Sequence, residues 1–182
     1  KQTLLDVAGG TGDITNRFKK RGGGRAIVCD INQQMLINGQ KKFSDSIPMK
    51  DTIWICGDAE KLPIDDKSVD VYTIAFGLRN ITNIQIALEE AHRVLRPGGR
   101  FLCLEFSDFS IRVLKPLYEA YSFKIIPQIG NVVANDKGSY KYLVESIRQF
   151  PDQTQLISRM REAGLEQCKF RNLSGGIAAI HS

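Results

Sequence analysis

Apolar and polar residues alternate along the chain in blocks that predict strands separated by helices. Apolar residues spaced as on one helix face run from Ile84 to Leu95, and Pro97-Gly98-Gly99 predicts the end of that helix. Strands separated by helices imply right-handed crossovers, so the pattern predicts a doubly wound α/β fold with a parallel sheet. Short apolar runs predict its strands at residues 3–8, 26–30, 52–56, 69–76 and 101–106.

The last third of the chain departs from this alternation. Helical periodicity predicts helices over residues 113–129, 140–148 and 152–163, the first of them broken by two prolines. The final runs, 166–170 and 177–181, flank a Ser-Gly-Gly turn and predict a strand pair, which requires at least one antiparallel edge strand. We expect a single domain over residues 1–182, with residues 108–142 as an insertion that could cover the site.

Composition and charge exclude few classes of protein. The chain is 42% hydrophobic and 25% charged, which is typical of a globular protein. No run approaches 18 apolar residues, so we expect no transmembrane helix. Lys1 leads directly into the first apolar run, as in a fragment whose targeting segment would lie upstream. The net charge of +5 is spread out and fits a solvated surface, with weak attraction to nucleic acid or anionic lipid as the alternative.

The four cysteines carry a limited signal. Cys29, Cys56, Cys103 and Cys168 each lie in an apolar run that predicts a buried strand. They form no Cys-x-x-Cys pair and no cluster with histidine, so we expect no metal site. Scattered core thiols indicate a reducing compartment.

A glycine-rich loop follows the first predicted strand, with the sequence Asp6-Val7-Ala8-Gly9-Gly10-Thr11-Gly12-Asp13. Glycines at this place allow a tight turn and a close approach of the backbone to a ligand. The dinucleotide fingerprint fails, because the third glycine position counted from Gly10 holds Thr15. Asp13 would also repel a pyrophosphate at the start of the next helix. The loop therefore favours S-adenosylmethionine, a phosphate-free cation, over a nicotinamide dinucleotide; a simple tight turn is the alternative.

Two acidic turns follow the next two strands. Asp30 ends the second strand 18 residues after Gly12, where its carboxylate could accept hydrogen bonds from a ribose diol or could cap the helix that begins near Ile31. After the third strand, Asp58 could accept from an adenine amino group and the Ala59 amide could donate to a ring nitrogen, or the segment could be a plain turn. The carboxyl ends of parallel strands share one edge, so the sequence predicts a nucleoside site there.

The fourth strand ends in Ala75-Phe76-Gly77-Leu78-Arg79-Asn80. Many amino-directed methyltransferases have a polar-Pro-Pro-aromatic tetrapeptide at this place, which this chain lacks. Methylation of nucleic-acid bases or protein amides is therefore disfavoured. Arg79 and Asn80 instead offer hydrogen-bond donors at the point of transfer, and the alternative for Arg79 is an ion pair with Glu105 at the end of the fifth strand.

Several stretches closely resemble the ubiquinone/menaquinone biosynthesis C-methyltransferase family. They are the glycine loop, Phe76-Gly77-Leu78-Arg79-Asn80, Arg93-Val94-Leu95-Arg96-Pro97-Gly98-Gly99, Leu104-Glu105-Phe106-Ser107, Tyr140-x-Tyr142-Leu143-x-Glu145-Ser146-Ile147 and Gly175-Gly176-Ile177-x-Ala179-Ile180-His181. The resemblance spans essentially all 182 residues. The second and fifth stretches are more specific to the family than the glycine loop and the Pro-Gly-Gly element, which occur across methyltransferases.

The resemblance implies a class I methyltransferase fold, with a Rossmann-like, seven-stranded, mostly parallel sheet and a C-terminal antiparallel hairpin. It implies methyl transfer from S-adenosyl-L-methionine to a ring carbon of a polyprenylated methoxy-benzoquinol, or of demethylmenaquinol in the menaquinone pathway. The alternative is a non-catalytic, cofactor-binding scaffold of a quinone-synthesis complex. Family members have a segment before the first strand that this domain would lack, and some have Ser at the position of Ala75.

The resemblance carries cofactor roles to Thr11, Asp30, Asp58 and Ala59. The full set of candidate cofactor contacts is Asp6, Gly9, Gly10, Thr11, Gly12, Asp30, Ile31, Asp58, Ala59 and Ala75.

Deprotonation of a quinol hydroxyl would make the ring carbon nucleophilic. Arg79 cannot act as an ordinary base, so we hypothesise that Arg79 and Asn80, the candidate catalytic residues, orient a water molecule or the phenolate oxygen. His92 and His181 are expected to be structural. Further candidates to line the acceptor pocket are Tyr118, Tyr121, Asn135 and Tyr140.

The expected partners are a polyprenylated quinol, a membrane surface, and a second copy or a quinone-synthesis complex, with no nucleic acid. The apolar, aromatic-rich stretch 113–129 could cover an isoprenoid tail, touch a membrane, pack as a lid or form a dimer interface. The expected location is the matrix face of the mitochondrial inner membrane in a eukaryote, or the cytoplasm at the membrane periphery in a bacterium.

Overall fold

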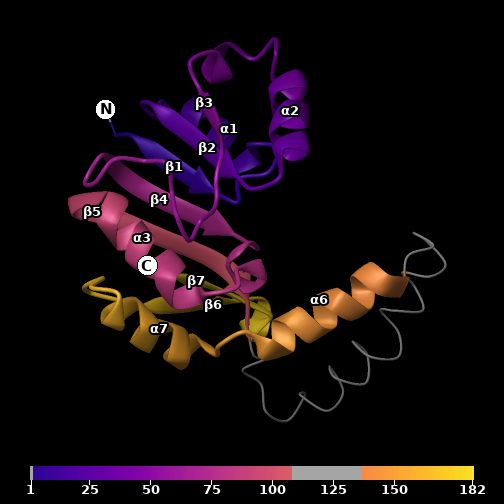
Figure 1. The fold of residues 1–182 in the computed structure, drawn as a ribbon, viewed down its shortest axis with the longest axis vertical. Helices are drawn as coiled ribbons and strands as arrows, with labels where there is room; N and C mark the ends of the chain where they lie inside the picture. Colours follow the sequence, from indigo (N-terminus) through magenta and orange to yellow (C-terminus); the bar gives the residue numbers. More distant parts are fainter. Residues whose placement is uncertain (1, 108–136) are drawn as a thin grey trace.

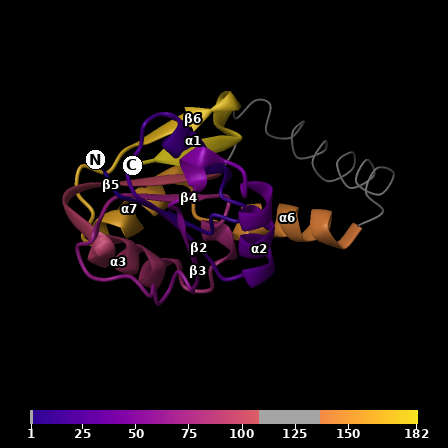
Figure 2. The same cartoon turned by 90° about the horizontal axis from the view of Figure 1, so that it is seen from above.

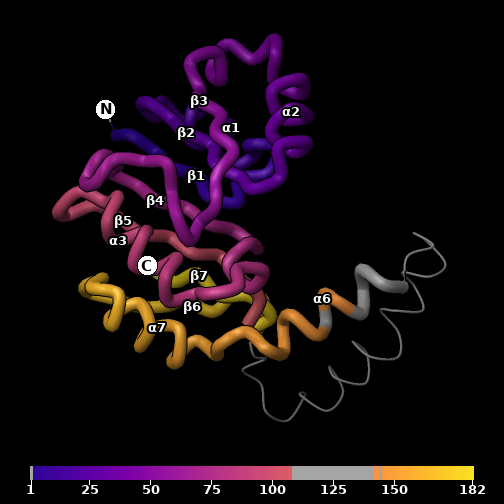
Figure 3. Tube along the Cα trace, viewed as in Figure 1, coloured from indigo at the N-terminus to yellow at the C-terminus, as the bar shows by residue number. Residues whose placement is uncertain are grey.

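The computed structural model describes residues 2–107 and 137–182 of the chain (Figures 1 and 3). Its described strands form one seven-stranded sheet in the order β3-β2-β1-β4-β5-β7-β6. The first five pair in parallel, and β7 pairs antiparallel with both β5 and β6. The predicted mostly parallel sheet with a reversed C-terminal hairpin is therefore confirmed. The strands are β1 (Leu4–Val7), β2 (Ala26–Asp30), β3 (Ile53–Cys56), β4 (Val69–Ala75), β5 (Leu95–Phe106), β6 (Phe170–Leu173) and β7 (Ala178–His181).

Helices cover both faces of the sheet. Figure 2 shows α1 on one side, and α3 and α7 together on the other, as expected for a doubly wound fold. Helix α6 extends away from the sheet (Figure 1). The helices are α1 (Asp13–Lys20), α2 (Gln33–Lys42), α3 (Ile84–Val94), α6 (Lys137–Gln149) and α7 (Gln153–Glu162), with short 3-10 turns η1 (Ile47–Met49), η2 (Leu78–Asn80) and η4 (Ser174–Gly176).

The main core lies between the sheet and helices α3 and α7. Successive residues of a strand point to opposite faces, so Leu5 belongs to this core while Leu4 belongs to a smaller cluster with Phe18 of α1. The apolar stripe predicted for α3 is buried as expected. The core residues that α3 and α7 contribute include Ala87, Leu88, Ala91, Val94, Leu156 and Met160.

Helix α3 ends earlier than Pro97-Gly98-Gly99 predicted. The Asn83 side chain caps its start, and its last residue is Val94. The next residue, Leu95, already pairs with Val69 of β4, and regular pairing resumes at Arg100. The Pro-Gly-Gly element therefore forms an irregular segment within β5 and does not itself stop the helix.

The hairpin strands differ in how well the sequence predicted them. Strand β7 lies within the predicted residues 177–181, but the strand predicted over 166–170 is wrong, because β6 begins at Phe170. Gln167 has a φ of 52°, a left-handed conformation that interrupts an extended run. The side chains of β6 are mostly exposed, so its apolar pattern is weak.

The cysteine prediction holds for two residues and is wrong for the others. Cys29 and Cys103 are buried in central strands. Cys56 is exposed, because β3 is an edge strand with little covering it. Cys168 is half-buried and lies outside the strands, before β6.

Helix α7 begins with a reciprocal capping box, which gives a test of how this helix is anchored. The Asp152 carboxylate accepts from the Gln155 amide at 2.8 Å, and the Gln155 side chain accepts from the Asp152 amide at 3.1 Å. We expect Asp152→Ala to lower the free energy of unfolding by about 1 kcal/mol in urea denaturation, because the Gln155 amide loses its capping carboxylate. Asp45→Ala, at an exposed position, is the control; equal losses in both variants would contradict the role of the cap.

Candidate functional site

The loop after β1 is compact because of its glycines. Gly10 and Gly12 have φ angles of 54° and 79°, a conformation that glycine adopts without steric cost. At Gly9, an added Cβ would lie 2.8 Å from both the backbone oxygen of Asp6 and a methyl carbon of Val28. The loop backbone can therefore lie close to the ends of β1 and β2, and a ligand can approach it closely.

Asp6 lies beneath this loop, with 1% of its surface exposed. Its carboxylate accepts from the Thr73 hydroxyl of β4 at 2.7 Å and from the Thr15 hydroxyl of α1 at 2.9 Å. Burial raises the pKa of Asp6 to about 6, although both hydroxyls oppose the shift. Among the predicted cofactor residues, Asp6 is thus placed where it ties β1, β4 and α1 together under the loop.

Asp30 joins the glycine loop to the end of β2. Its Oδ2 atom accepts from the Gly10 amide at 2.8 Å, and its Oδ1 atom accepts from the Asn32 amide at 2.8 Å. Helix α2 is capped by Asn32, whose side chain accepts from the Gln34 and Met35 amides, so the alternative that Asp30 is the helix cap is wrong. A carboxylate has about four acceptor positions, so Asp30 keeps capacity for a ligand diol.

The turn after β3 meets the same edge. The Gly57 amide donates to the Asp30 backbone oxygen at 3.1 Å, which links this turn to β2. Asp58 is exposed and accepts from the Glu60 amide at 2.9 Å, while Ala59 is buried beside it. Gly10, Asp30 and Asp58 therefore gather along one edge of the sheet, as predicted.

Three other predicted cofactor residues border this edge. Ile31 is 71% exposed, an unusual state for a large apolar side chain directly after Asp30. Ala75 ends β4, and the chain then turns so tightly that a Cβ on Gly77 would lie 2.4 Å from that of Ala8. The turn after β4 therefore lies directly against the glycine loop. Within that loop, the Thr11 hydroxyl donates to Asp13 at 2.8 Å.

Arg79 forms the ion pair with Glu105 that the sequence offered as an alternative. Its Nη1 atom lies 2.7 Å from Oε1 of Glu105, whose side chain is fully buried, and donates to the Phe76 backbone oxygen at 2.6 Å. The guanidinium carbon is 5.1 Å from the centroid of the Phe106 ring. Burial raises the pKa of Glu105, while the Phe106 amide and Arg79 oppose the shift. The Arg79 Nε atom is buried and has no hydrogen-bond partner among the described residues.

Asn80 contacts a residue that sequence reasoning missed. The Tyr142 hydroxyl of α6 donates to Oδ1 of Asn80 at 3.1 Å. The Tyr140-x-Tyr142 stretch could have indicated this contact, but the sequence pattern predicted Tyr140, not Tyr142, as a pocket residue. Tyr140 lies in α6, but its side chain is outside the described part, as are the other predicted pocket residues, Tyr118, Tyr121 and Asn135.

The two histidines lie away from this edge. His92 lies in α3, where its ring is packed 3.1 Å from the position of a Cβ on Gly164. His181 is buried in β7, and burial lowers its pKa to about 4. Neither histidine is placed among the candidate site residues.

Several solved structures, most of them named as methyltransferases, share this fold at low sequence identity. An S-adenosylmethionine-dependent methyltransferase from Aquifex aeolicus matches with a TM-score of 0.67 at 16% identity, covering 99% of this chain and 80% of its own. A phosphoethanolamine N-methyltransferase from Haemonchus contortus, solved with S-adenosylhomocysteine, matches with a TM-score of 0.69 at 15% identity, covering 95% of this chain and 35% of its own. The [4+2]-cyclase SpnF matches with a TM-score of 0.72 at 20% identity, covering 97% of this chain and 55% of its own. These likenesses establish the class I methyltransferase fold.

The sequence comparisons are much closer. The ubiquinone/menaquinone biosynthesis C-methyltransferase UbiE of Roseobacter denitrificans is 54% identical over 183 residues, covering all of this chain and 73% of the relative. The mitochondrial 2-methoxy-6-polyprenyl-1,4-benzoquinol methylase of Bos taurus is 48% identical over 214 residues, covering 98% of this chain and 65% of the relative. A family model also matches residues 1–182. The chain thus belongs to the ubiE/COQ5 methyltransferase family and is an S-adenosylmethionine-dependent enzyme.

Proposed function

We propose that this protein transfers a methyl group from S-adenosylmethionine to a ring carbon of a polyprenylated methoxy-benzoquinol. The observation that carries the proposal is the contact between two turns. The glycine-rich loop, whose Gly10 amide is bonded to Asp30, meets the turn after β4 where Ala8 approaches Gly77, and that turn leads into Arg79 and Asn80. The relatives from Roseobacter denitrificans and Bos taurus are named for this type of reaction.

The residues present fit a phosphate-free nucleoside. Asp30 has acceptor capacity for the ribose diol, and Asp58 with the Ala59 amide could bind the adenine edge. Exposed Ile31 offers an apolar surface beside them. When bound, S-adenosylmethionine supplies an electrophilic methyl group on a sulfonium, and the protein's task is to align the acceptor and raise its nucleophilicity.

We propose that Arg79 stabilises the charge that develops on a quinol oxygen. A guanidinium stays protonated at neutral pH and therefore cannot act as a base. Its N–H donors, however, stabilise a phenolate more than a phenol. Glu105 fixes one nitrogen, Nη1, and the buried Nε remains without a partner among the described residues. A phenolate held by such donors pushes electron density onto the neighbouring ring carbon.

Aromatic side chains beside Arg79 favour a flat, apolar acceptor. The rings of Phe76 and Phe106 lie 4.7 Å apart, and Phe76 is 39% exposed. The hydrogen bond from Tyr142 to Asn80 places α6 beside this turn. This contact supports the proposal that residues 108–142 cover the acceptor site. Demethylmenaquinol would offer the same features and is the second candidate acceptor.

A polyprenylated acceptor resides in a lipid bilayer, so the enzyme would have to bind it at a membrane surface. No helix in the described ranges is both long and apolar enough to cross a bilayer. The net charge of +5 favours anionic lipid, and we propose peripheral binding, at the matrix face of the inner membrane in mitochondria or at the cytoplasmic face in bacteria. We also propose assembly as a homodimer or within a quinone-synthesis complex.

Incubation with methyl-labelled S-adenosylmethionine and short-chain methoxy-benzoquinol analogues tests the reaction itself. We expect the label on a ring carbon, read by mass spectrometry and NMR of the product. Demethylmenaquinol analogues assayed in parallel rank the two acceptors. Label on oxygen would contradict the proposed reaction, and binding of S-adenosylhomocysteine without any turnover would favour the scaffold alternative.

Asp30→Ala tests the nucleoside edge. The variant loses a charge-assisted acceptor for the ribose and the partner of the Gly10 amide, so we expect the Kd for S-adenosylhomocysteine to rise at least about ten-fold in calorimetry. Asp51→Ala is the matched control, because Asp51 pairs with Lys19 before β3. Unchanged affinity in Asp30→Ala would refute the ribose role of this carboxylate.

Arg79→Lys tests the acceptor side without leaving Glu105 buried and unpaired. Lysine keeps the positive charge but lacks the guanidinium fork, so we expect kcat to fall about 100-fold while the Kd for S-adenosylhomocysteine stays the same. Steady-state kinetics, calorimetry and a melting curve separate these effects. Full turnover in a stable Arg79→Lys protein would refute the role of Arg79 in the reaction.

A further inference from the structure

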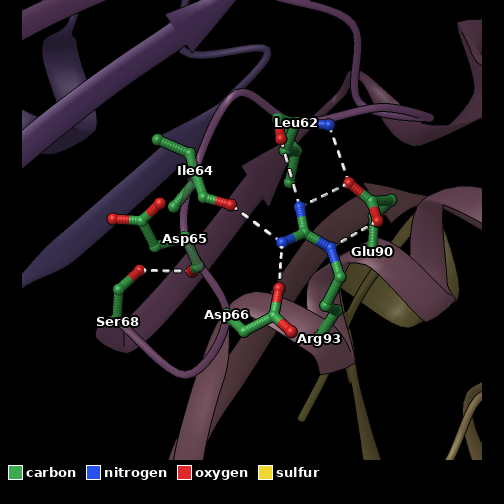
Figure 4. A network of polar contacts seen from close by, with 7 residues as sticks. All are labelled: Leu62, Ile64, Asp65, Asp66, Ser68, Glu90 and Arg93. Atoms are coloured by element: carbon green, nitrogen blue, oxygen red, sulfur yellow. Dashed lines mark hydrogen bonds and ion pairs between the residues drawn. The ribbon is translucent and has the colours of Figure 1, made fainter.

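Arg93 of α3 uses all five of its donors on neighbouring residues (Figure 4). Nε and Nη2 bond the two carboxylate oxygens of Glu90 at 2.6 and 2.8 Å. The remaining donors reach the loop of residues 57–68 between β3 and β4. They bond the Leu62 backbone oxygen at 3.1 Å, the Ile64 backbone oxygen at 2.8 Å and the Asp66 carboxylate at 2.6 Å.

Glu90 completes the attachment from the other side of the same residue. Its Oε2 atom accepts from the Leu62 amide at 2.7 Å, so both backbone polar groups of Leu62 are bound by the Arg93–Glu90 pair. The hydrogen bond from Arg93 holds the pKa of Glu90 below its usual range, so the carboxylate stays ionised at neutral pH. Leu62 itself is buried.

The immobilised Leu62 directly follows the turn that contains the proposed base-binding residues. Within that turn, the Lys61 amide donates to the Asp58 backbone oxygen at 3.1 Å, and the Glu60 amide donates to the Asp58 carboxylate. Glu60 is also bound to the start of α3, because its carboxylate accepts from the amide of the capping residue Asn83 at 2.8 Å. The turn is therefore fixed to α3 at Glu60 and at Leu62.

We propose that Arg93 is a positioning residue for recognition of the nucleoside base. Through Leu62 it holds Asp58 and the Ala59 amide at the spacing that distinguishes adenine from hypoxanthine. Adenine presents an amino donor and a ring acceptor on one edge, whereas hypoxanthine presents an oxygen and a ring N–H there. A loop fixed in place cannot rearrange to accept the second pattern, because its own groups would be left unpaired. This inference rests on the proposed base-binding role of Asp58 and Ala59.

Arg93→Lys is the variant that isolates the network. Lysine retains the charge but has three donors in place of five, so it cannot serve Glu90, Leu62, Ile64 and Asp66 together. Arg96→Lys is the matched control, because Arg96 stands in the same helix-to-strand stretch and pairs with Asp70. A second variant, Glu90→Gln, weakens the same attachment from the other partner.

The measurement is calorimetric binding of S-adenosylhomocysteine and S-inosylhomocysteine to each variant, with hydrogen exchange at the Leu62 amide. We expect Arg93→Lys and Glu90→Gln to weaken S-adenosylhomocysteine binding about ten-fold and to narrow the preference for adenine by a similar factor. We expect faster exchange at Leu62 in both. Arg96→Lys should match the parent protein in all three readouts.

The outcomes separate this inference from the function on which it rests. If the parent protein does not bind S-adenosylhomocysteine, the proposed function fails. If the parent protein binds and Arg93→Lys shows faster exchange with unchanged affinity and unchanged base preference, the network only stabilises the loop and the inference is overturned. A lower melting temperature with an unchanged ratio of the two dissociation constants would show a general loss of stability and would also overturn the inference.

Discussion

The parallel register of β1 with both of its neighbours is the constraint on which the whole site depends. Val7 pairs with Cys29 of β2 on one side and with Ile74 of β4 on the other, so three chain turns emerge at the same level. The buried Asp6 carboxylate secures this register by accepting from hydroxyls on β4 and α1. Burial of that carboxylate is unfavourable, as its raised pKa shows, and two hydrogen bonds offset part of the cost.

The sequence predicted the positions of the three turns after β1, β2 and β3, because the topology of a parallel sheet leaves them little choice of place. Once a parallel sheet is expected, Gly10, Asp30 and Asp58 must lie at the carboxyl ends of their strands. Features set by tertiary contacts were beyond such reasoning. The Tyr142–Asn80 hydrogen bond joins residues 62 positions apart and depends on how α6 meets η2. Gln167 has a left-handed conformation, which glutamine rarely adopts and its residue type does not predict, and β6 begins only after it.

The ion pair of Arg79 with Glu105 and the proposed role of Arg79 at the acceptor are compatible. A fully buried carboxylate requires a partner, and a flexible arginine beside an empty acceptor site would lose conformational entropy on binding. Pairing Nη1 with Glu105 holds the guanidinium against the Phe106 ring before any ligand arrives. If Arg79 has the proposed role, the ion pair preorganises its remaining donors, so pairing with Glu105 and contact with the acceptor do not exclude each other.

Arg79 and Arg93 both lie in stretches that resemble the family, but their hydrogen-bond donors are used differently. The five donors of Arg93 bond five acceptor atoms on four residues, so Arg93 has nothing left to offer a ligand and can act only by holding other groups. Arg79 has a buried Nε that is unpaired within residues 2–107 and 137–182. An unpaired buried donor costs about 1–3 kcal/mol, and a ligand oxygen that reaches it would relieve this cost. A phenolate gains more than a phenol from such a donor, which is the difference that C-methylation of a quinol requires.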